Sequence, residues 1–388
     1  MKVTLKPKEE HRILSGHLWV FSNEIASIEP EAVTGDLVTV HRSNGEQIGS
    51  GFLNRNSLIA VRLLGDTNVS DIHAYLRSAI LSAASLRRDI LFRGDACRLV
   101  FGESDGLPGL IIDRFNNSFV IQISSAGMER YKEFIVSVLV EEFQAKNVIT
   151  RHQMGLRRLE GLPESDEILK GEEATEEIFV NGIQYSVNLS SGQKTGFYFD
   201  QTDNRAYVQN LAAGKSVLDA FCNSGGFGLH AMKGGAVSVD FVDASEDELA
   251  QVEKNIQLNG FTAPHNLVHG DVFDFLFKVA STGKQYQMVM IDPPAFTKSR
   301  KDIPVALKAY EKLHRAAIHV TAPGSILVSS SCSFHIKNDP LLQAIDTAFR
   351  KSGRKYKILH TATAAPDHPV LAAMPETTYL KFFVFYIL

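Results

Sequence analysis

The feature that most constrains this chain of 388 residues is an apolar run that ends in an acid and a turn of small residues. The stretch is Val217-Leu218-Asp219-Ala220-Phe221-Cys222-Asn223-Ser224-Gly225-Gly226-Phe227. Its pattern predicts a buried strand, a glycine turn and the start of a helix. Glycine lets a backbone approach a ligand where a Cβ would clash, and a helix start offers free N–H groups. The stretch therefore predicts the strand–turn–helix of a nucleotide-binding α/β unit.

Three further acids fall where the next strands of such a sheet would end. They are Asp243 after Val237–Val242, Asp271 after His269-Gly270, and Asp292 after Met288–Ile291 and before Pro293-Pro294. Ligands of doubly wound sheets bind outside the carboxyl ends of the strands, so four acids at four ends describe one pocket. Asp243 suits the two hydroxyls of a ribose, and Asp271 suits the amino group of an adenine.

The turn is not a Gly-x-Gly-x-x-Gly fingerprint, and an Asp-Pro-Pro has no place in a dehydrogenase. The pattern resembles the class I S-adenosylmethionine-dependent methyltransferases, which implies S-adenosylmethionine as the cofactor. The cofactor contacts expected on this resemblance are Phe199, Gln201, Asp219, Phe221, Asn223, Gly225, Asp243, Asp271 and Asp292. The plainer alternative is a generic α/β domain with incidental acids at its strand ends.

Length and composition indicate a soluble protein of two or three domains. Hydrophobic residues make up 44% and charged residues 22% of the chain, as in globular proteins. No apolar run reaches membrane-spanning length, and the N-terminus lacks a signal-peptide core. Cys97, Cys222 and Cys332 have neither metal-type spacing nor the even number of a disulfide framework. We therefore expect a cytoplasmic protein with no metal site and no membrane partner.

Residues 1–67 contain four short apolar runs separated by Gly, Asn and Ser turns, which predicts a small β-barrel. The runs are Leu18–Phe21, Asp36–Val40, Ile48–Leu53 and Leu58–Leu64. The stretch Arg12–Phe21 resembles the start of a PUA domain, a small RNA-binding barrel. Trp19 is expected in its core rather than on a base-stacking surface.

Residues 71–175 predict a central α+β domain. We expect helices over Ile72–Phe92 and Glu129–Phe143, with strands over Arg98–Gly102, Leu110–Phe115, Phe119–Ser124 and Val148–Thr150. Between Glu160 and Glu177 the chain holds eight acids and one Lys, which predicts a solvated linker rather than a site.

Residues 176–388 predict the methyltransferase domain. A hairpin over Ile178–Asn188, turning at Asn181-Gly182, precedes the glycine- and aromatic-rich stretch Ser191–Gln201. That stretch suits either a loop over a cofactor or a plain connection from hairpin to helix. After the fourth strand we expect a helix over Ile303–Val320, a strand over Gly324–Ser331, a helix over Leu341–Arg350, and a closing strand pair at Tyr356–Leu359 and Tyr379–Ile387.

Cys332 follows the fifth predicted strand, next to the strand that ends in Asp292. A cysteine beside an acid at the mouth of a pocket can act as a nucleophile. Methylation of a pyrimidine carbon needs one, because thiolate attack at carbon 6 makes carbon 5 reactive while an acid holds a proton at ring nitrogen 3. Cys332 and Asp292 fit these two catalytic roles. The alternative for a lone cysteine is a small buried hydrophobe, which we expect for Cys97 and Cys222.

A local basic cluster lies in the segment between these two strands. It contains Lys298, Arg300, Lys301, Lys308, Lys312 and Arg315. Because the net charge of the chain is −4, any surface for nucleic acid has to be local. We interpret Lys298, Arg300 and Lys301 as RNA contacts, the alternative being a solvated helix face.

The motifs together resemble one family, the bacterial 23S ribosomal RNA cytosine-5 methyltransferases with PUA, central and Rossmann-like domains. The resemblance rests on the PUA-like start, Phe197–Gln201, Phe221–Phe227, Asp292–Phe296, Ser331-Cys332-Ser333 and Asp367-His368-Pro369. It implies a cysteine nucleophile and a target in naked or partly assembled ribosomal RNA. Many wider relatives carry a second cysteine after the proline of the Asp-Pro motif for product release. Ala295 and Phe296 stand there instead, so the release base is unidentified.

Two other functions stay open on the sequence. One is methylation of an RNA amino or ring nitrogen, which uses an Asp-Pro-Pro-aromatic loop and needs no nucleophile. The other is an RNA-binding assembly factor that retains the fold without turnover. The sequence leaves undecided which nucleotide is modified and whether the chain forms a homodimer.

Overall fold

The computed structural model describes residues 1–65, 67–189, 195–297 and 299–388. The chain folds into two compact units. The first contains residues 1–178, 187–199 and 366–377, and the second contains residues 179–186, 200–365 and 378–388. From the sequence we expected one boundary near residue 176. The structure instead assigns residues 366–377, which lie near the end of the chain, to the first unit.

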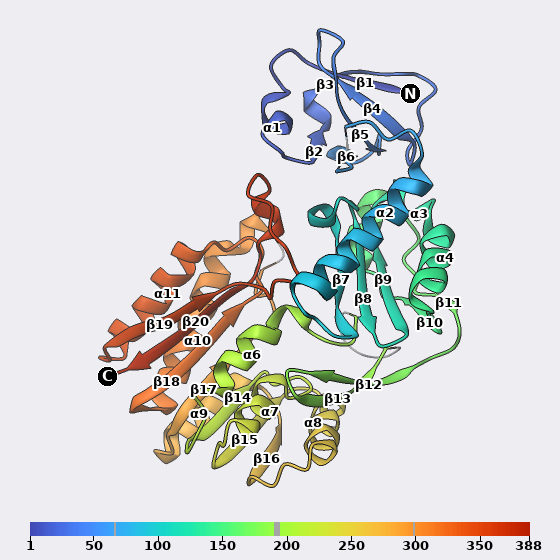
Figure 1. Ribbon diagram of the computed structural model, residues 1–388. Helices are drawn as coiled ribbons and strands as arrows, with labels where there is room; N and C mark the ends of the chain where they lie inside the picture. The colour runs from blue at the N-terminus through green and yellow to red at the C-terminus, as the bar shows by residue number, and fades with distance from the viewer. Residues whose placement is uncertain (66, 190–194, 298) are drawn as a thin grey trace. The chain divides into compact units, whose positions relative to one another are not determined.

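The first unit begins with a six-stranded sheet in the order β2-β6-β5-β4-β1-β3, shown in blue in Figure 1. Its strands are β1 (Lys2–Leu5), β2 (Trp19–Phe21), β3 (Ile25–Ile28), β4 (Leu37–His41), β5 (Gln47–Leu53) and β6 (Ile59–Leu63), with a short helix α1 (His11–Leu14). The four expected strands are present, whereas β1, β3 and α1 were not predicted. Trp19 is half-buried, and its Nε1 donates to Glu103 at 2.7 Å.

The same unit contains a second sheet in the order β11-β10-β9-β8-β7. Its strands are β7 (Ala96–Phe101), β8 (Leu110–Phe115), β9 (Ser118–Ile123), β10 (Asn147–Thr150) and β11 (Ile168–Lys170). Its helices are α2 (Ile72–Ser85), which continues into a π turn η2 (Leu86–Ile90), α3 (Ala126–Glu129), α4 (Lys132–Phe143) and α5 (Met154–Glu160), with a 3-10 turn η3 (Gly102–Asp105). The expected helix from Glu129 therefore begins only at Lys132.

The prediction of a solvated linker over 160–177 was wrong in part. Glu160 is 5% exposed. Its carboxylate accepts from Asn54 Nδ2 at 2.8 Å and pairs with Arg62 at 3.2 Å. Strand β11 of the second sheet also lies inside this segment. An acid-rich composition predicts exposure only on average, and here an arginine from a distant strand compensates the buried charge.

The second unit contains a seven-stranded sheet in the order β16-β15-β14-β17-β18-β20-β19, parallel except for β20. Its strands are β14 (Ser216–Ala220), β15 (Ser238–Asp243), β16 (His265–His269), β17 (Tyr286–Ile291), β18 (Thr321–Ser331), β19 (Tyr356–Ala362) and β20 (Lys381–Ile387). A hairpin of β12 (Thr175–Val180) and β13 (Ile183–Asn188) precedes this sheet, turning at Asn181-Gly182 as expected. The order confirms a Rossmann-like fold: successive strands are added on one side of β14 up to β16 and then on its other side from β17, so the switch point lies between the parallel strands β14 and β17.

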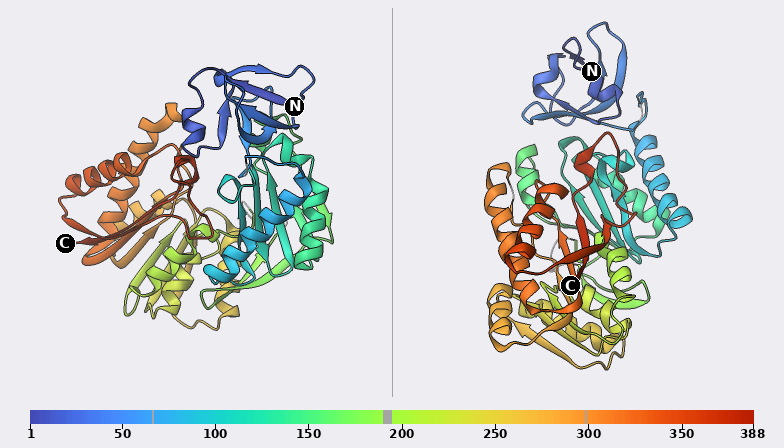
Figure 2. Two further views of the ribbon diagram at one scale, coloured as in Figure 1. Left: turned by 45° about the horizontal axis from the view of Figure 1, so that its top comes forward. Right: turned by 90° about the vertical axis from the view of Figure 1, so that its left-hand side faces the viewer.

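Helices cover both faces of this sheet, and they are α6 (Thr202–Gln209), α7 (Gly226–Lys233), α8 (Glu246–Leu258), α9 (Val272–Thr282), α10 (Ile303–Val320) and α11 (Asn338–Lys351). Short 3-10 turns lie at η4 (Phe199–Gln201), η5 (Arg300–Asp302) and η6 (Pro375–Thr377). Helix α10 packs between α9 and α11 on one face, and the right-hand view of Figure 2 shows α6 on the opposite side of the sheet. Across the described ranges, no helix has both the length and the apolarity needed to cross a membrane.

Candidate active site

The turn after β14 is held in a strained backbone conformation. Phe221 and Asn223 have φ of 61° and 48°, and Gly225 has φ of 86°. Positive φ costs free energy for residues other than glycine, and such strain concentrates at binding and catalytic sites. Next to the turn, a Cβ at Gly228 would lie 2.1 Å from the ring of Phe241, so glycine is needed for α7 to pack on the sheet. The backbone strain and the close packing at Gly228 show that this turn has a specific conformation, as a ligand-binding turn requires.

Two of the predicted acids hold this turn in place. Asp243 Oδ2, at the end of β15, accepts from the backbone N–H of Asn223 at 2.9 Å. Asp219 Oδ2, inside β14, accepts from the N–H of Gly228 at 2.7 Å. Burial, together with the nearby charges of Asp292 and Asp243, raises the pKa of Asp219 to about 7. Asp219 and Asp243 thus support the same turn from the carboxyl ends of the neighbouring strands β14 and β15.

Asp271 has a structural role that the sequence interpretation missed. It caps the N-terminus of α9, because its Oδ1 accepts from the N–H groups of Phe273 at 2.8 Å and Asp274 at 3.1 Å. Such a cap satisfies N–H groups that have no partner within the helix. Its contact with adenine stays a prediction.

Asp292 lies just after β17 and is oriented by two side chains. Ser330 Oγ, on the neighbouring strand β18, donates to its Oδ1 at 2.6 Å, and Gln201 Nε2 donates to its Oδ2 at 3.1 Å. Gln201 is itself held by Asn204, whose Nδ2 donates to Gln201 Oε1 at 2.7 Å. Ser330, Gln201 and Asn204 are all at most 3% exposed. These bonds fix the direction in which the carboxylate meets a ligand.

Cys332 follows β18 directly. The residues on either side of it, Ser331 and Ser333, form hydrogen bonds with the buried hydroxyl of Tyr310. The Tyr310 hydroxyl lies 2.8 Å from Ser331 Oγ and 2.9 Å from Ser333 Oγ. The backbone N–H of Phe296 donates to the same Ser333 Oγ at 3.2 Å. The Asp-Pro-Pro segment and the cysteine segment are therefore tied together. Cys332 is half-buried, whereas Cys97 and Cys222 are buried as expected.

Lys381, at the start of β20, was not singled out from the sequence. Its side chain is 6% exposed. Its Nζ donates to the carbonyl oxygen of Ser333 at 2.6 Å. Burial lowers its pKa to about 8, against the opposing effect of a negative charge on Cys332. The residues that follow Lys381 in β20 are almost all apolar. A lysine in such a strand is unusual, and this pattern could have indicated its role from the sequence.

Phe199 lies in a packed core. Its ring is 1% exposed and packs against Phe115 and Phe197 of the same unit, with ring centroids 5.2 Å and 5.1 Å away. This gives the side chain a structural role that the sequence interpretation did not include, and its contact with the cofactor stays a prediction. Residues 191–194 of the same predicted loop lie outside the described residues.

The basic cluster is exposed wherever it is described. Arg300 and Lys301 lie on η5, and Lys308, Lys312 and Arg315 follow on the outer face of α10. Lys298 lies outside the described residues. The inner face of α10 carries Tyr310 and His314, which are buried. One helix therefore presents positive charge outward and supports the cysteine segment inward.

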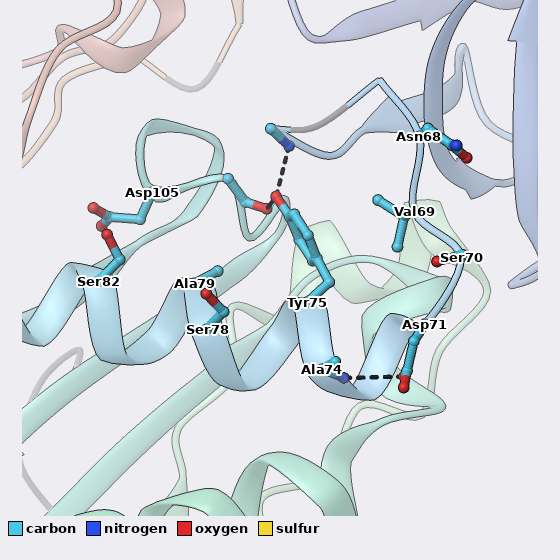
Figure 3. Close-up of a pocket in the computed structure, with 12 residues that line it drawn as sticks. Asn68, Val69, Ser70, Asp71, Ala74, Tyr75, Ser78, Ala79, Ser82 and Asp105 are labelled. Carbon is cyan, nitrogen blue, oxygen red and sulfur yellow. Dashed lines mark hydrogen bonds between the residues drawn. The ribbon is translucent and has the colours of Figure 1, made fainter.

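A cavity of about 530 Å³ lies in the first unit, at the N-terminus of α2 (Figure 3). The hydroxyl of Tyr75 spans it, accepting from Gly65 N–H at 2.7 Å and donating to the carbonyl of Gly106 at 2.8 Å. Its two carboxylates are already engaged, Asp71 as the helix cap and Asp105 in a bidentate pair with Arg87. Among the described residues that line this cavity, neither carboxylate is therefore free for acid–base work, and the predicted chemistry lies in the second unit.

Comparison with known proteins agrees with this geometry. Residues 3–66 match the family described as a PUA-like domain, and residues 145–383 match the S-adenosylmethionine-dependent methyltransferase family. Similar solved structures include that of a Streptococcus mutans protein assigned by name as a SAM-dependent methyltransferase, with a TM-score of 0.84, 22% identity and full coverage of both chains. Another, in complex with SAH, has a TM-score of 0.85 and 22% identity. At this identity the likeness shows the fold.

The curated relatives are similar over nearly the whole chain. Ribosomal RNA large subunit methyltransferase I of Shewanella amazonensis is 35% identical, with 98% of both chains covered. The proteins of the same name from Pseudoalteromonas atlantica and Vibrio parahaemolyticus are 34% and 35% identical, with coverage of 98% and 96%. The acids at the strand ends also fit a cofactor with ribose hydroxyls and a cationic centre. The chain therefore belongs to the S-adenosylmethionine-dependent methyltransferases, in the group whose curated members are named ribosomal RNA large subunit methyltransferase I.

Proposed function

We propose that this protein methylates carbon 5 of a cytosine in large-subunit ribosomal RNA through a covalent adduct with Cys332. The observation that carries the proposal is the placement of Asp292 and Cys332 after the adjacent strands β17 and β18, joined through Ser330. S-adenosylmethionine supplies the methyl group when it is bound. The names of the relatives support ribosomal RNA as the substrate.

In the proposed reaction, different residues bind the target base, the thiolate and the cofactor. Cys332 attacks carbon 6 of the extruded base, and the Asp292 carboxylate accepts a hydrogen bond from the protonated ring nitrogen 3. The buried ammonium of Lys381 stabilises the thiolate. Asp243 binds the ribose of the cofactor, and the glycines of the turn after β14 let the backbone approach the cofactor closely.

RNA contact is assigned to two surfaces. One is the PUA-like sheet, within the proposed domain 1–67. The other is the exposed cluster around Arg300 and Lys301, in the proposed methyltransferase domain 176–388; the central domain 71–175 lies between them in the sequence. A homodimer stays a prediction that light scattering of the purified protein would test.

Nitrogen methylation is less well supported. That chemistry needs an aromatic ring after Asp-Pro-Pro to stack on the base. The ring of Phe296 instead packs on the buried Tyr310, with centroids 4.7 Å apart, and against the core of the second unit. A non-catalytic assembly factor would have no use for the oriented Asp292.

The decisive experiment uses RNA that carries 5-fluorocytosine at the target. The wild-type protein should form a covalent complex that survives denaturing electrophoresis, because fluorine cannot leave as a proton does. Cys332→Ala should form none and should lose methyl transfer, while Cys97→Ala and Cys222→Ala keep most activity. An active Cys332→Ala protein would favour nitrogen methylation.

A further inference from the structure

The buried amine of Lys381 is placed against the cysteine segment by strand register. In the antiparallel pair of β18 and β20, Lys381 is the Cα partner of Ser331, one residue before Cys332. Its Nζ donates to the carbonyl oxygens of Ser333 at 2.6 Å and Tyr379 at 2.7 Å. Within the described ranges, no carboxylate forms an ion pair with it. A buried lysine without a carboxylate partner is uncommon and calls for a chemical reason.

The two carbonyls fit the neutral amine as well as the ammonium. A neutral amine has two N–H donors, which the oxygens of Ser333 and Tyr379 satisfy, and one lone pair. Burial is the main cause that lowers the pKa of Lys381 to about 8; a negative charge on Cys332 opposes this shift and the positive charge of Lys337 adds to it. Near neutral pH, roughly a tenth of the protein therefore carries the neutral amine. In the neutral amine, Cε and the two hydrogen atoms occupy three of the four tetrahedral positions around Nζ, and the lone pair occupies the fourth.

We propose that Lys381 is the base that removes the proton from carbon 5 in the last step of the reaction. The proposal rests on the cytosine-5 function above and supplies the base that the Asp-Pro-Pro segment lacks, because Ala295 and Phe296 follow Pro294 and neither side chain can take a proton. Sulfur and methyl that add to opposite faces of the ring leave the carbon 5 proton on the face of the sulfur. Because Lys381 lies beside the cysteine segment, a base attacked by Cys332 would turn that face toward the amine.

The proton balance closes with solvent as the only other participant. Ring nitrogen 3 takes up a proton from water when the thiolate attacks, the Asp292 carboxylate holds that proton by a hydrogen bond, and the ring returns it to water when the sulfur leaves. Once the carbon 6–sulfur bond has formed, the sulfur carries no charge, so the ammonium of Lys381 loses its stabilising anion and releases a proton to water. After carbon 5 has received its methyl group, the amine takes the carbon 5 proton. The electron pair of the C–H bond forms the C5=C6 double bond, and the carbon 6–sulfur bond breaks. The thiolate and the ammonium are then side by side again.

The test compares Lys381→Met with the wild type on ordinary ribosomal RNA and on RNA with 5-fluorocytosine. On ordinary RNA, Lys381→Met should turn over at least a hundredfold more slowly. It should also accumulate a methylated covalent complex that the wild type does not accumulate. On fluorinated RNA, Lys381→Met should form the complex more slowly, because the ammonium that stabilises the thiolate is gone, but it should reach the same final extent as the wild type. Lys381→Arg retains a positive charge but has no basic lone pair, so it should behave like Lys381→Met.

Lys357→Met is the matched control, because Lys357 is exposed on the neighbouring strand β19. It should turn over like the wild type. Melting temperatures and cofactor affinities of all variants check that they fold. If Lys381→Met forms no complex on fluorinated RNA even after long incubation, Lys381 acts only by activating the thiol and the base assignment is wrong. If the wild type itself forms no complex on fluorinated RNA, the cytosine-5 function fails, which is a separate outcome.

Discussion

Ser330 donates a hydrogen bond of 2.6 Å to Asp292, across the parallel pair of strands β17 and β18. The bond connects the acid of the Asp-Pro-Pro segment to the strand that carries the cysteine. Because Ser330 is 1% exposed, water cannot easily replace it. The orientation of the proposed acid therefore depends on a serine that does not itself reach the substrate.

We expect Ser330→Ala to lower kcat while cofactor affinity changes little. A hydrogen bond to a charged group contributes about 1.5–3 kcal/mol, which corresponds to a loss of roughly ten- to a hundredfold in rate. Single-turnover methyl transfer measures the effect. Ser281→Ala, at an exposed position on α9, is the control. Wild-type kcat in Ser330→Ala would show that Asp292 needs no such support.

The fold was predictable because its signals are local. The helix expected over Ile303–Val320 matches α10 to the residue, since apolar positions repeat along it and Pro304 occupies its first turn. The acids lie at the ends of predicted strands. In a Rossmann-like sheet these strands are parallel, so Asp219, Asp243 and Asp292 lie together at the carboxyl ends of the strands.

The groups that orient the site were harder to predict because their partners are distant in sequence. Lys381 meets Ser333 from 48 residues away, and Glu160 meets Arg62 from 98 residues away. Composition assigns each of these charges to the surface, whereas strand pairing buries them. Nothing in a single sequence specifies which strands bring such partners together.

We expect Asp243→Ala to weaken S-adenosylmethionine binding ten- to a hundredfold, measured by calorimetry. The loss follows from removing charge-assisted hydrogen bonds to a ribose, each worth about 1.5–3 kcal/mol. The Asp243 carboxylate also accepts from the N–H groups of Asn223 and Ser245, so the turn loses support as well. Asp274→Ala, exposed on α9, should bind normally. Unchanged affinity in Asp243→Ala would remove Asp243 from the cofactor site.

Asp219 predicts a pH-dependent stability in the cofactor-free protein. Its folded-state pKa of about 7 lies above the ordinary value, so the folded state binds more protons and stability falls as pH rises from about 4 to about 7. The loss is on the order of 2–4 kcal/mol. Asp219→Asn removes the titration. Its melting temperature relative to the wild type should therefore be several degrees higher at pH 7.5 than at pH 4.5. A constant difference between the two proteins would contradict the raised pKa.

The exposed basic cluster predicts how RNA affinity depends on salt. Each phosphate contact contributes about 0.7 to the slope of log affinity against log salt for single-stranded nucleic acid. Replacing both Arg300 and Lys301 by Ala should therefore reduce that slope by about 1.4, with cofactor affinity unchanged. Filter binding at several salt concentrations measures the slope. Point variants are preferable to deleting residues 1–67, because Arg62 of that segment pairs with the buried Glu160 and its loss would leave that carboxylate uncompensated.

The matched control is Arg350→Ala with Lys351→Ala, the same two residue types at the end of α11. These side chains are already paired within the protein, Arg350 with Asp346 at 2.9 Å and Lys351 with Glu311 at 2.6 Å. Their removal should leave the salt slope unchanged, because a cation held by a carboxylate releases few counterions on binding RNA. Equal slopes in the two double variants would show that Arg300 and Lys301 do not contact phosphate. A smaller slope only in the Arg300 and Lys301 variant would assign this part of the RNA footprint to η5.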